Sequence, residues 1–533
     1  GIDKIEPQLA QYNEEPLEKT GKSHRTPEQR AKRNKKCFLI ILALCVVGAA
    51  IGAALGVTMT KDKSSNDGDA SNASDKGGVP SASTTRPPTP AVDPDLVAGS
   101  GTRPPTPTDE ESVSKEIAAL NVLKSALPVE SYAAVSDVNL ATPQNAALDW
   151  ILYEDEFMDP YWEGLTQNPP EEEAEFHFIQ RYVAMTLYTV LDGVSWTDNS
   201  KWKTSEDVCD WYGIDCVGED VDEGAYQEQG SGGRRRHREL QDEEEKEGTI
   251  IGLKLSQNLL DGWLPADISA LTSLQHLEMH KNKIRGQLPP YLYDMTSLRT
   301  LFLDYNKIEG EIPAEVGNLV NLEKLTLNEN EIWGEIPTEI GLLTNLNMLW
   351  LFGNEYLEGP FPAEIANLVN LKSLALFNTE ITGEIPDLSG LQKLEVFKVE
   401  SCNLSGDGFM SLYNVPSMVA LGVAGNEEIT GTLEGIENLV NLQELYVGET
   451  KMSGPLTEGL GALTKMKFIK SSEAAFTGAL PASIGNLVDL EELDFSLNSL
   501  NGALPEELGQ LTKLEKVALH GNGECNISIC VVY

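Results

Sequence analysis

The stretch MTSLRTLFLDYNKIEGEIPAEVGNL, from Met295 to Leu319, decides the fold because its pattern recurs through the second half of this 533-residue chain. Each copy contains a short apolar segment of the form LxLxxN. The residues that close these segments lie 24 positions apart, except for one interval of 25 and one of 23 that cancel. Twelve copies in fixed register are typical of a solenoid, in which similar units stack on one another. The closing residues are Asn258, Asn282, Asn306, Asn330, Asn354, Thr379, Cys402, Asn426, Thr450, Ala474, Asn498 and Asn522.

Each part of the repeat has a physical role. Side chains alternate between the two faces of a strand, so Leu301 and Leu303 should point into the core while Phe302 points outward. The closing asparagine can hydrogen-bond backbone groups of the turn beside it, which satisfies peptide groups where the chain bends. Pro313 prevents an early helix start, and the run Ala314–Leu322 then predicts a short helix or 3₁₀ turn on the convex side.

The full consensus LxxLxLxxNxLxGxIPxxLGxL resembles the plant-type leucine-rich repeat of receptor-kinase ectodomains and polygalacturonase-inhibiting proteins. The resemblance covers residues 249–522 and implies an α/β solenoid, a curved horseshoe of about twelve repeats that binds proteins, peptides or glycans. It also implies that the Cys209–Cys216 segment belongs to an N-terminal cap and the Cys525–Cys530 segment to a C-terminal cap. An apolar span precedes the repeats, whereas receptor kinases place it after them. No kinase domain follows up to Tyr533, so receptor-kinase signalling is not expected.

An uncharged run of 23 residues, from Cys37 to Met59, is long enough to cross a bilayer core of ~30 Å as a helix. Basic residues are concentrated before this run. The positive-inside bias therefore predicts a single-pass type II membrane protein, at the plasma membrane, with its repeats extracellular. Gly48, Gly52 and Gly56 recur every four residues, a spacing that suits a homodimer of such helices but also occurs in monomeric spans.

Composition separates the remaining segments. A Ser/Thr/Pro-rich region with two TRPPTP hexamers predicts an extended stalk. A later segment combines helix-like apolar spacing with tryptophans and close cysteines, which suits a cap over the end of a solenoid. Opposite charge blocks then predict a disordered insertion, whose Arg234–Arg238 run resembles a dibasic processing site or a solvated charge run. The predicted divisions are a basic cytoplasmic tail (1–36), the transmembrane helix (37–59), the stalk (60–112), a helical N-terminal cap (113–217), the insertion (218–248), the repeats (249–521) and a C-terminal cap (522–533).

The cysteines indicate an oxidising compartment. Cys209 with Cys216, and Cys525 with Cys530, are close pairs that flank the repeats, and each pair predicts a disulfide. Cys402 stands among the closing residues of the repeats and should stay reduced and buried. In the predicted topology three sequons become available to glycosylation. They begin at Asn72, Asn403 and Asn526.

Charge and motifs argue against several functions. Lys and Arg number 40 and Asp and Glu 83, so the net charge of −43 disfavours nucleic acid as a partner. The sequence contains no GxSxG, Walker, HExxH or GxGxxG motif, and we expect neither an enzyme nor a cofactor. His276 and His280 share a strand face, but four strand residues separate them by ~13 Å, too far to share one metal.

The outward strand positions carry several aromatic side chains, and exposed aromatic clusters usually mark interaction sites. Glycans, a second copy or the 218–248 insertion could equally cover them. The leading hypothesis is a membrane-anchored recognition or adhesion protein that binds an extracellular protein, peptide or glycan on its concave face. The alternative is an inhibitor of a secreted hydrolase. Trp350 should be the main anchor. Most other inner positions are polar or small and should act as spacers, such as Thr326, Asn328, Ala420, Gly422 and Ala424. The predicted ligand-binding residues are Phe302, Tyr305, Met348, Trp350, Phe352, Phe377 and Tyr446.

Overall fold

The structure, a computed structural model, describes residues 110–137, 141–218, 236–237 and 246–522. All of these residues belong to one compact unit of the chain, Ala91–Tyr533. The predicted transmembrane segment 37–59, the cytoplasmic tail and most of the stalk lie outside them. Within the described segments, no helix is both long and apolar enough to cross a membrane. The other predicted sites that lie outside the described residues are Gly48, Gly52, Gly56, Asn72, Cys525, Asn526 and Cys530.

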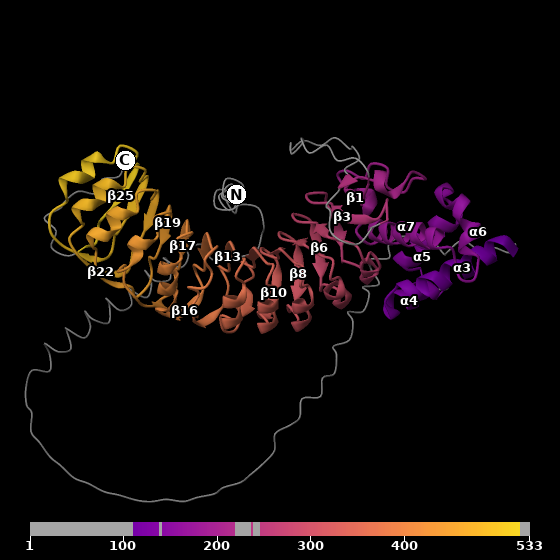
Figure 1. The fold of residues 1–533 in the computed structure, drawn as a ribbon, viewed down its shortest axis with the longest axis horizontal. Helices are drawn as coiled ribbons and strands as arrows, with labels where there is room; N and C mark the ends of the chain where they lie inside the picture. Colours follow the sequence, from indigo (N-terminus) through magenta and orange to yellow (C-terminus); the bar gives the residue numbers. More distant parts are fainter. Residues whose placement is uncertain (1–109, 138–140, 219–235, 238–245, 523–533) are drawn as a thin grey trace, which may run out of the picture. The chain divides into compact units, whose positions relative to one another are not determined.

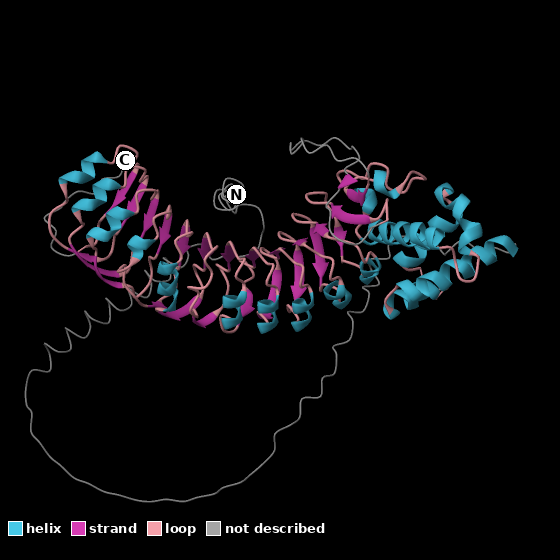
Figure 2. Ribbon diagram, viewed as in Figure 1, coloured by secondary structure: helices cyan, strands magenta, loops and turns pink. Residues whose placement is uncertain are grey.

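The repeats contribute one short strand each to a 14-stranded sheet on the inner side of the array (Figure 2). From β3 onward each strand pairs in parallel with the next, and equivalent leucines such as Leu277, Leu301 and Leu325 lie in register. These leucines form a continuous buried core, as expected for a solenoid. The strands are β3 (Ile250–Lys254), β5 (His276–Glu278), β7 (Thr300–Phe302), β9 (Lys324–Thr326), β11 (Met348–Trp350), β13 (Ser373–Ala375), β15 (Val396–Lys398), β17 (Ala420–Gly422), β19 (Glu444–Tyr446), β21 (Phe468–Lys470), β23 (Glu492–Asp494) and β25 (Lys516–Ala518).

A second set of short strands follows the turn of each repeat and forms smaller parallel sheets. We call the five-stranded one, in the order β12-β10-β8-β6-β4, the lateral sheet. A single bridge between Pro360 and Thr382 connects it to the next sheet, at the repeat where the interval lengthens to 25 residues. The lateral sheet contains β4 (Asp261–Gly262), β6 (Lys283–Gly286), β8 (Lys307–Gly310), β10 (Glu331–Glu335) and β12 (Tyr356–Glu358). The other two sheets contain β14 (Thr382–Glu384), β16 (Asn403–Gly406) and β18 (Glu428–Ile429), and β20 (Ser453–Pro455), β22 (Ala475–Gly478) and β24 (Ser499–Leu500).

Short 3₁₀ helices cover the outer side of the repeats, as Figure 2 shows in cyan. The helix η8 (Ala314–Asn318) begins directly after Pro313, which confirms the predicted 3₁₀ turn. The corresponding helices are η6 (Ala266–Ala270), η7 (Pro290–Asp294), η9 (Thr338–Leu342), η10 (Ala363–Asn367), η11 (Gly408–Asn414), η12 (Ile436–Asn438), η13 (Glu458–Ala462), η14 (Ala482–Asn486) and η15 (Glu506–Gln510).

The closing asparagines form a hydrogen-bonded ladder through the core. Asn306 Oδ1 accepts from the backbone N–H of Ile284 at 2.9 Å, and its Nδ2 donates to the carbonyls of Met279 and Leu303 at 3.0 Å. From Asn282 onward each asparagine therefore satisfies backbone groups of its own repeat and of the preceding one, as predicted, whereas the amide of Asn258 bonds the backbone of Asp198. Cys402 is a free, buried thiol at the equivalent position, which confirms the prediction for that residue.

Helices at the N-terminal side pack on the first repeat (Figure 1). Their contact contains a carboxylate with no exposed surface, Asp267, which accepts hydrogen bonds from Ser131 Oγ, Gln144 Nε2 and Tyr182 Oη at 2.9–3.2 Å. One carboxylate thus joins three helices to the repeats. The elements of this region are α3 (Glu110–Ala126), α4 (Val129–Ser136), α5 (Pro143–Tyr153), η3 (Glu156–Tyr161), α6 (Trp162–Leu165), α7 (Glu172–Val190), η4 (Gly193–Ser195), η5 (Val208–Asp210), β1 (Ile214–Val217) and β2 (Arg236–His237).

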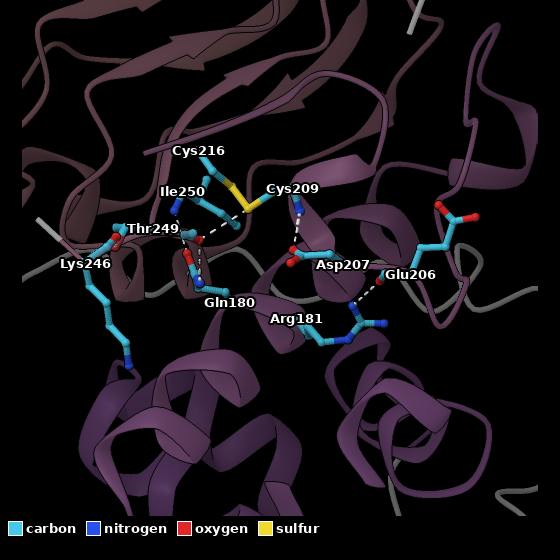
Figure 3. Close-up of a disulfide and its surroundings, with 10 residues drawn as sticks. Gln180, Arg181, Glu206, Asp207, Cys209, Cys216, Lys246, Thr249 and Ile250 are labelled. Atoms are coloured by element: carbon cyan, nitrogen blue, oxygen red, sulfur yellow. Dashed lines mark hydrogen bonds between the residues drawn. A yellow bond between two sulfur atoms is a disulfide. The ribbon is translucent and has the colours of Figure 1, made fainter. Parts of the chain in front are cut away.

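The disulfide predicted between Cys209 and Cys216 is present, and Figure 3 shows its surroundings. It links η5 to β1, which pairs antiparallel with β3 at the start of the repeats. Gln180 on α7 reaches the same place, because its Oε1 accepts from the backbone N–H of Ile250 at 2.6 Å. Covalent and hydrogen bonds therefore fix the helical region to the first inner strand.

The side chain of Arg181 organises the interior of the helical region. Its guanidinium is fully buried and donates to both carboxylate oxygens of Asp155 at 2.5 and 2.7 Å. It also donates to the backbone carbonyls of Thr204 and Glu206, the second of which is drawn in Figure 3. A buried ion pair of this kind is tolerated because every donor finds an acceptor.

Candidate functional site

The candidate site is the concave face, which we define as the outward-pointing side chains of the 14-stranded sheet. Three positions of each repeat face outward, and the strand pairing places equivalent positions side by side. On β11, for example, Met348 lies opposite Ser373 and Trp350 opposite Ala375. Residues one repeat apart in sequence, 25 positions here and 24 in most of the array, are therefore neighbours on this face.

Four of the predicted binding residues, Met348, Trp350, Phe352 and Phe377, lie together and form what we call the concave aromatic cluster. The rings of Phe352 and Phe377 stack with centroids 4.2 Å apart and an interplanar angle of 11°. The ring of Trp350 lies 6.2 Å from that of Phe352, and its Nε1 donates to Ser373 Oγ at 2.8 Å. The proximity expected from the sequence is therefore present.

The expectation that these four side chains are exposed to water is wrong for three of them. Trp350 is 3 % exposed, Phe352 1 % and Met348 5 %, and only Phe377 of the cluster is half-buried. The neighbouring strand β13 carries the small outward residues Ser373 and Ala375, which leave space for the larger side chains of β11 to lie against the sheet. The side chains then cover one another. They are attached to the outward face of the sheet but are not in contact with water.

The remaining predicted residues are half-buried and lie on either side of this cluster. The ring of Phe302 is 6.4 Å from that of His280, and the ring of Tyr305 is 5.8 Å from Lys281 Nζ. Tyr446 lies on β19, between Lys398 Nζ at 5.3 Å and Lys470 Nζ at 5.6 Å. The structure thus brings four of the seven predicted residues together and leaves three separate from them.

A second group, which we call the concave ionic cluster, comprises Lys398, Glu400, Glu444 and Tyr446. Lys398 Nζ is 2.9 Å from Glu444 Oε2, and the bridge passes over β17, which lies between their strands. The outward residues of β17 are small, so the long side chains of β15 and β19 fold into the space. A Cβ placed on Gly422 would lie 2.0 Å from Glu400 Oε1, which shows how closely that carboxylate covers the glycine.

The carboxylate of Glu400 is incompletely satisfied. Its Oε2 is buried and has no hydrogen-bond partner among the residues that the structure describes. Burial raises the pKa of Glu400 to about 7; Glu444 adds to the increase, and Lys398 opposes it. Burial also raises the pKa of the Tyr446 hydroxyl, with Glu444 as the next cause. The cluster therefore holds a carboxyl that can change charge near neutral pH.

Asn328 is a second unsatisfied polar group on the concave face. It follows β9 and faces outward beside β11. Its side chain has no exposed surface, and neither polar atom of its amide has a partner in the described part of the chain. Its backbone carbonyl accepts from Tyr305, so the side chain alone is unpaired. From the sequence we interpreted Asn328 as a spacer and missed Glu400, because polar residues are common on this face. The available signal was the small Gly422 and Ala420, which we interpreted as spacers.

The repeats of this chain are leucine-rich repeats. The family described as a leucine-rich repeat region matches residues 291–403 and 370–530, in agreement with the repeat consensus and the one inner strand per repeat. None of the curated proteins matches the sequence.

Several solved structures are similar to this chain. The plant peptide hormone receptor RGFR1 in complex with RGF2 is 34 % identical over 51 % of this chain and 43 % of that one, with a TM-score of 0.49. A TDR receptor is 28 % identical over 51 % and 55 %, with a TM-score of 0.43. The Arabidopsis receptor kinase HAESA ectodomain, with an IDA peptide hormone, is 26 % identical over 50 % and 53 %, with a TM-score of 0.41. The chain thus spans less than two thirds of the length of each.

Proposed function

We propose that the chain is a recognition protein that binds an extracellular protein, peptide or glycan on its concave face. The observation that carries this proposal is the pair of buried, unpartnered polar groups on that face, the Asn328 amide and Glu400 Oε2. Native proteins leave few such groups, and each costs about 1–3 kcal/mol when no hydrogen bond compensates it. A ligand that supplies those hydrogen bonds offsets this cost when it binds.

The positions of the two groups define the area that a ligand is expected to cover on the concave face. Asn328 lies beside the concave aromatic cluster and Glu400 within the concave ionic cluster, and the intervening strands β11 and β13 separate them. A ligand that reaches both crosses at least four strands, about 15 Å at the usual strand spacing. Of the concave aromatic cluster between them, Phe377 is half-buried and provides apolar contact area once a ligand excludes water.

Matched substitutions on the two sides of the repeats test this function. Wild-type full-length protein on intact cells should be cross-linked to its extracellular partners, with Asn328→Ala and Glu400→Gln compared with Asn318→Ala and Glu315→Gln. The control residues are exposed on η8, on the outer side. Loss of partners from the first two variants alone is the expected result. Identical capture by all four variants would sink the proposal.

Membrane anchoring through residues 37–59, with the repeats outside the cell, is part of the same proposal, as are a homodimer through Gly48, Gly52 and Gly56 and a disulfide between Cys525 and Cys530. Asn403 supports the topology because it is exposed on β16 and available to a glycosyltransferase. A glycosidase should increase the gel mobility of the wild-type protein by more than that of Asn403→Gln. The proposed topology is wrong if the glycosidase changes the mobility of the wild-type protein and of Asn403→Gln equally and the repeats resist protease on intact cells. The repeats would then lie on the cytoplasmic side.

A further inference from the structure

The lateral sheet presents two aromatic side chains that the concave face does not include. Trp333 on β10 is 42 % exposed and Tyr356 on β12 is 65 % exposed, and the two residues lie directly opposite each other in the pairing of these strands. The chain has eight tryptophans, all within the described residues, and Trp333 has the largest exposed fraction of them. No ring contact joins Trp333 to Tyr356 or to any other described residue.

The backbone beneath these rings is firmly held. Ile332 and Leu357, the neighbours of the two aromatic residues, are buried in the core of the repeats. Parallel pairing continues from β12 through β10 and β8 to β4. A ligand that contacts the rings therefore meets side chains fixed on a rigid sheet, with little backbone entropy left to lose.

Acidic side chains surround the aromatic pair. Glu335 lies directly opposite Glu358, and Glu331 directly opposite Glu309, so two like-charged pairs flank Trp333 and Tyr356 on the sheet. Like charges directly opposite each other destabilise a sheet. The side chain of Glu311 lies close by, since a Cβ placed on Gly334 would be 2.9 Å from its Cγ.

Four carboxylates of this patch are not neutralised by the described part of the protein. Glu309, Glu311, Glu335 and Glu358 are exposed and have no ion-pair partner among the described residues. On the same sheet Arg285 pairs with Asp261 at 3.2 Å, on the side away from β12. The aromatic pair is thus bordered by uncompensated negative charge.

We propose that Trp333, Tyr356 and the flanking carboxylates form a docking site for the arginine or lysine side chains of a basic segment in a partner protein. A cation placed over an aromatic face is attracted by the ring, and carboxylates next to the ring strengthen its hold. The same cation relieves the repulsion between Glu335 and Glu358. A neutral glycan would use the rings but would leave that repulsion in place. This surface is separate from the concave face and does not depend on its function.

The test uses the full-length protein with hexa-arginine as the probe and hexa-citrulline, its uncharged isostere, as the control peptide. Trp333→Ala and Tyr356→Ala should each weaken hexa-arginine binding about two- to fivefold, the scale of a cation–π contact at an exposed site. Leu342→Ala, which removes an exposed apolar side chain on the outer side, should leave the affinity unchanged. Hexa-citrulline should bind weakly and equally to every variant.

Fluorescence quenching provides an independent readout. Caesium ions should quench the exposed tryptophan emission more strongly than iodide ions, because the carboxylates attract the cation and repel the anion. Trp333→Phe should abolish the difference, and saturating hexa-arginine should reduce it. Hexa-arginine binding that is unaffected by Trp333→Ala and Tyr356→Ala overturns the proposal. So does equal quenching by the two ions, or binding of neutral oligosaccharides that these variants abolish while hexa-arginine binding persists.

Discussion

Trp333 and Trp350 belong to adjacent repeats, 17 positions apart in sequence, yet one is 42 % exposed and the other 3 %. Both point away from the leucine core. The difference comes from the neighbouring strand. Trp350 lies beside Ser373 and Ala375, whose small side chains leave room for its ring against the sheet. Trp333 lies beside Tyr356, which occupies the corresponding space. The exposure of an outward side chain therefore depends on the size of the side chain beside it on the neighbouring strand, which belongs to the next repeat.

The largest expected effect is on stability at the concave face. Trp350→Ala should lower the free energy of unfolding by about 3–5 kcal/mol, because it leaves a cavity in a packed cluster and removes the partner of Ser373 Oγ. Denaturant unfolding of the purified protein measures this change. Trp333→Ala, in the preceding repeat, is the matched control. Equal stability of the two variants would show that the concave rings are not packed as described.

The concave ionic cluster should make stability depend on pH. Glu400 has a pKa raised from 4.5 to about 7 in the folded chain, so between these values the folded state keeps a proton that the unfolded state has released. The free energy of unfolding should therefore fall by about 3 kcal/mol as pH rises from about 4.5 to about 7. Glu400→Gln should remove this part of the pH dependence.

Exposed Glu315→Gln is the control for Glu400→Gln, because both changes remove one carboxylate from the chain. The informative quantity is the difference between the wild-type and variant pH profiles, since other groups titrate in the same range. Wild-type and Glu400→Gln profiles that run parallel from pH 4.5 to pH 7 would contradict a buried, uncompensated carboxyl at this position.

A smaller effect should follow removal of one hydrogen bond from the concave aromatic cluster. Ser373→Ala deletes the acceptor of the Trp350 indole N–H and should cost about 1 kcal/mol, since Ser373 is itself buried and the indole then loses its partner. The mutation should also shift the tryptophan absorption in near-UV difference spectra. An unchanged midpoint of denaturation would mean that water replaces the serine hydroxyl.

The smallest stability effects are expected on the lateral sheet. Trp333→Ala and Tyr356→Ala should each change the free energy of unfolding by no more than about 0.5 kcal/mol, as is usual for exposed positions without a special role. The same variants should weaken hexa-arginine binding, so at these positions a loss of binding is expected without a loss of stability. A loss above about 2 kcal/mol would assign these rings to the core rather than to a docking surface.

Much of the fold follows from the sequence because the repeat specifies it many times over. The register of the strands, the inward Leu301 and Leu303 and the bonds made by Asn306 are each set by residues within one repeat. The Cys209–Cys216 disulfide is equally local, since seven positions separate the two residues. Such features need no knowledge of how distant side chains pack.

The candidate site was harder to predict because it depends on contacts between repeats. Strand alternation identified Trp350 and Phe352 as outward residues but could not show that their rings cover one another. Glu400 was missed because its burial depends on Gly422, in the next repeat. Trp333 was not predicted because its place beside Tyr356 depends on the pairing of β10 with β12, which belong to different repeats. In each case the deciding neighbour lies more than 20 positions away in sequence.

The asparagine ladder also determines how the array comes apart. At the first place where asparagine is replaced, Thr379 Oγ1 donates to the Leu376 carbonyl of its own repeat, and Cys402 Sγ lies 3.3 Å from both that carbonyl and Thr379 Oγ1. At the same place the lateral sheet ends, and the single bridge between Pro360 and Thr382 replaces its continuous pairing.

The ladder is interrupted again at Thr450, which donates only to Val447 of its own repeat, and at Ala474, whose side chain forms no hydrogen bond; a second break between the smaller sheets, from β18 to β20, lies beside them. In a chain of nearest-neighbour units, cooperativity weakens where adjoining units share fewest bonds. Under force or denaturant, the array should therefore yield at these two junctions and behave as three cooperative blocks.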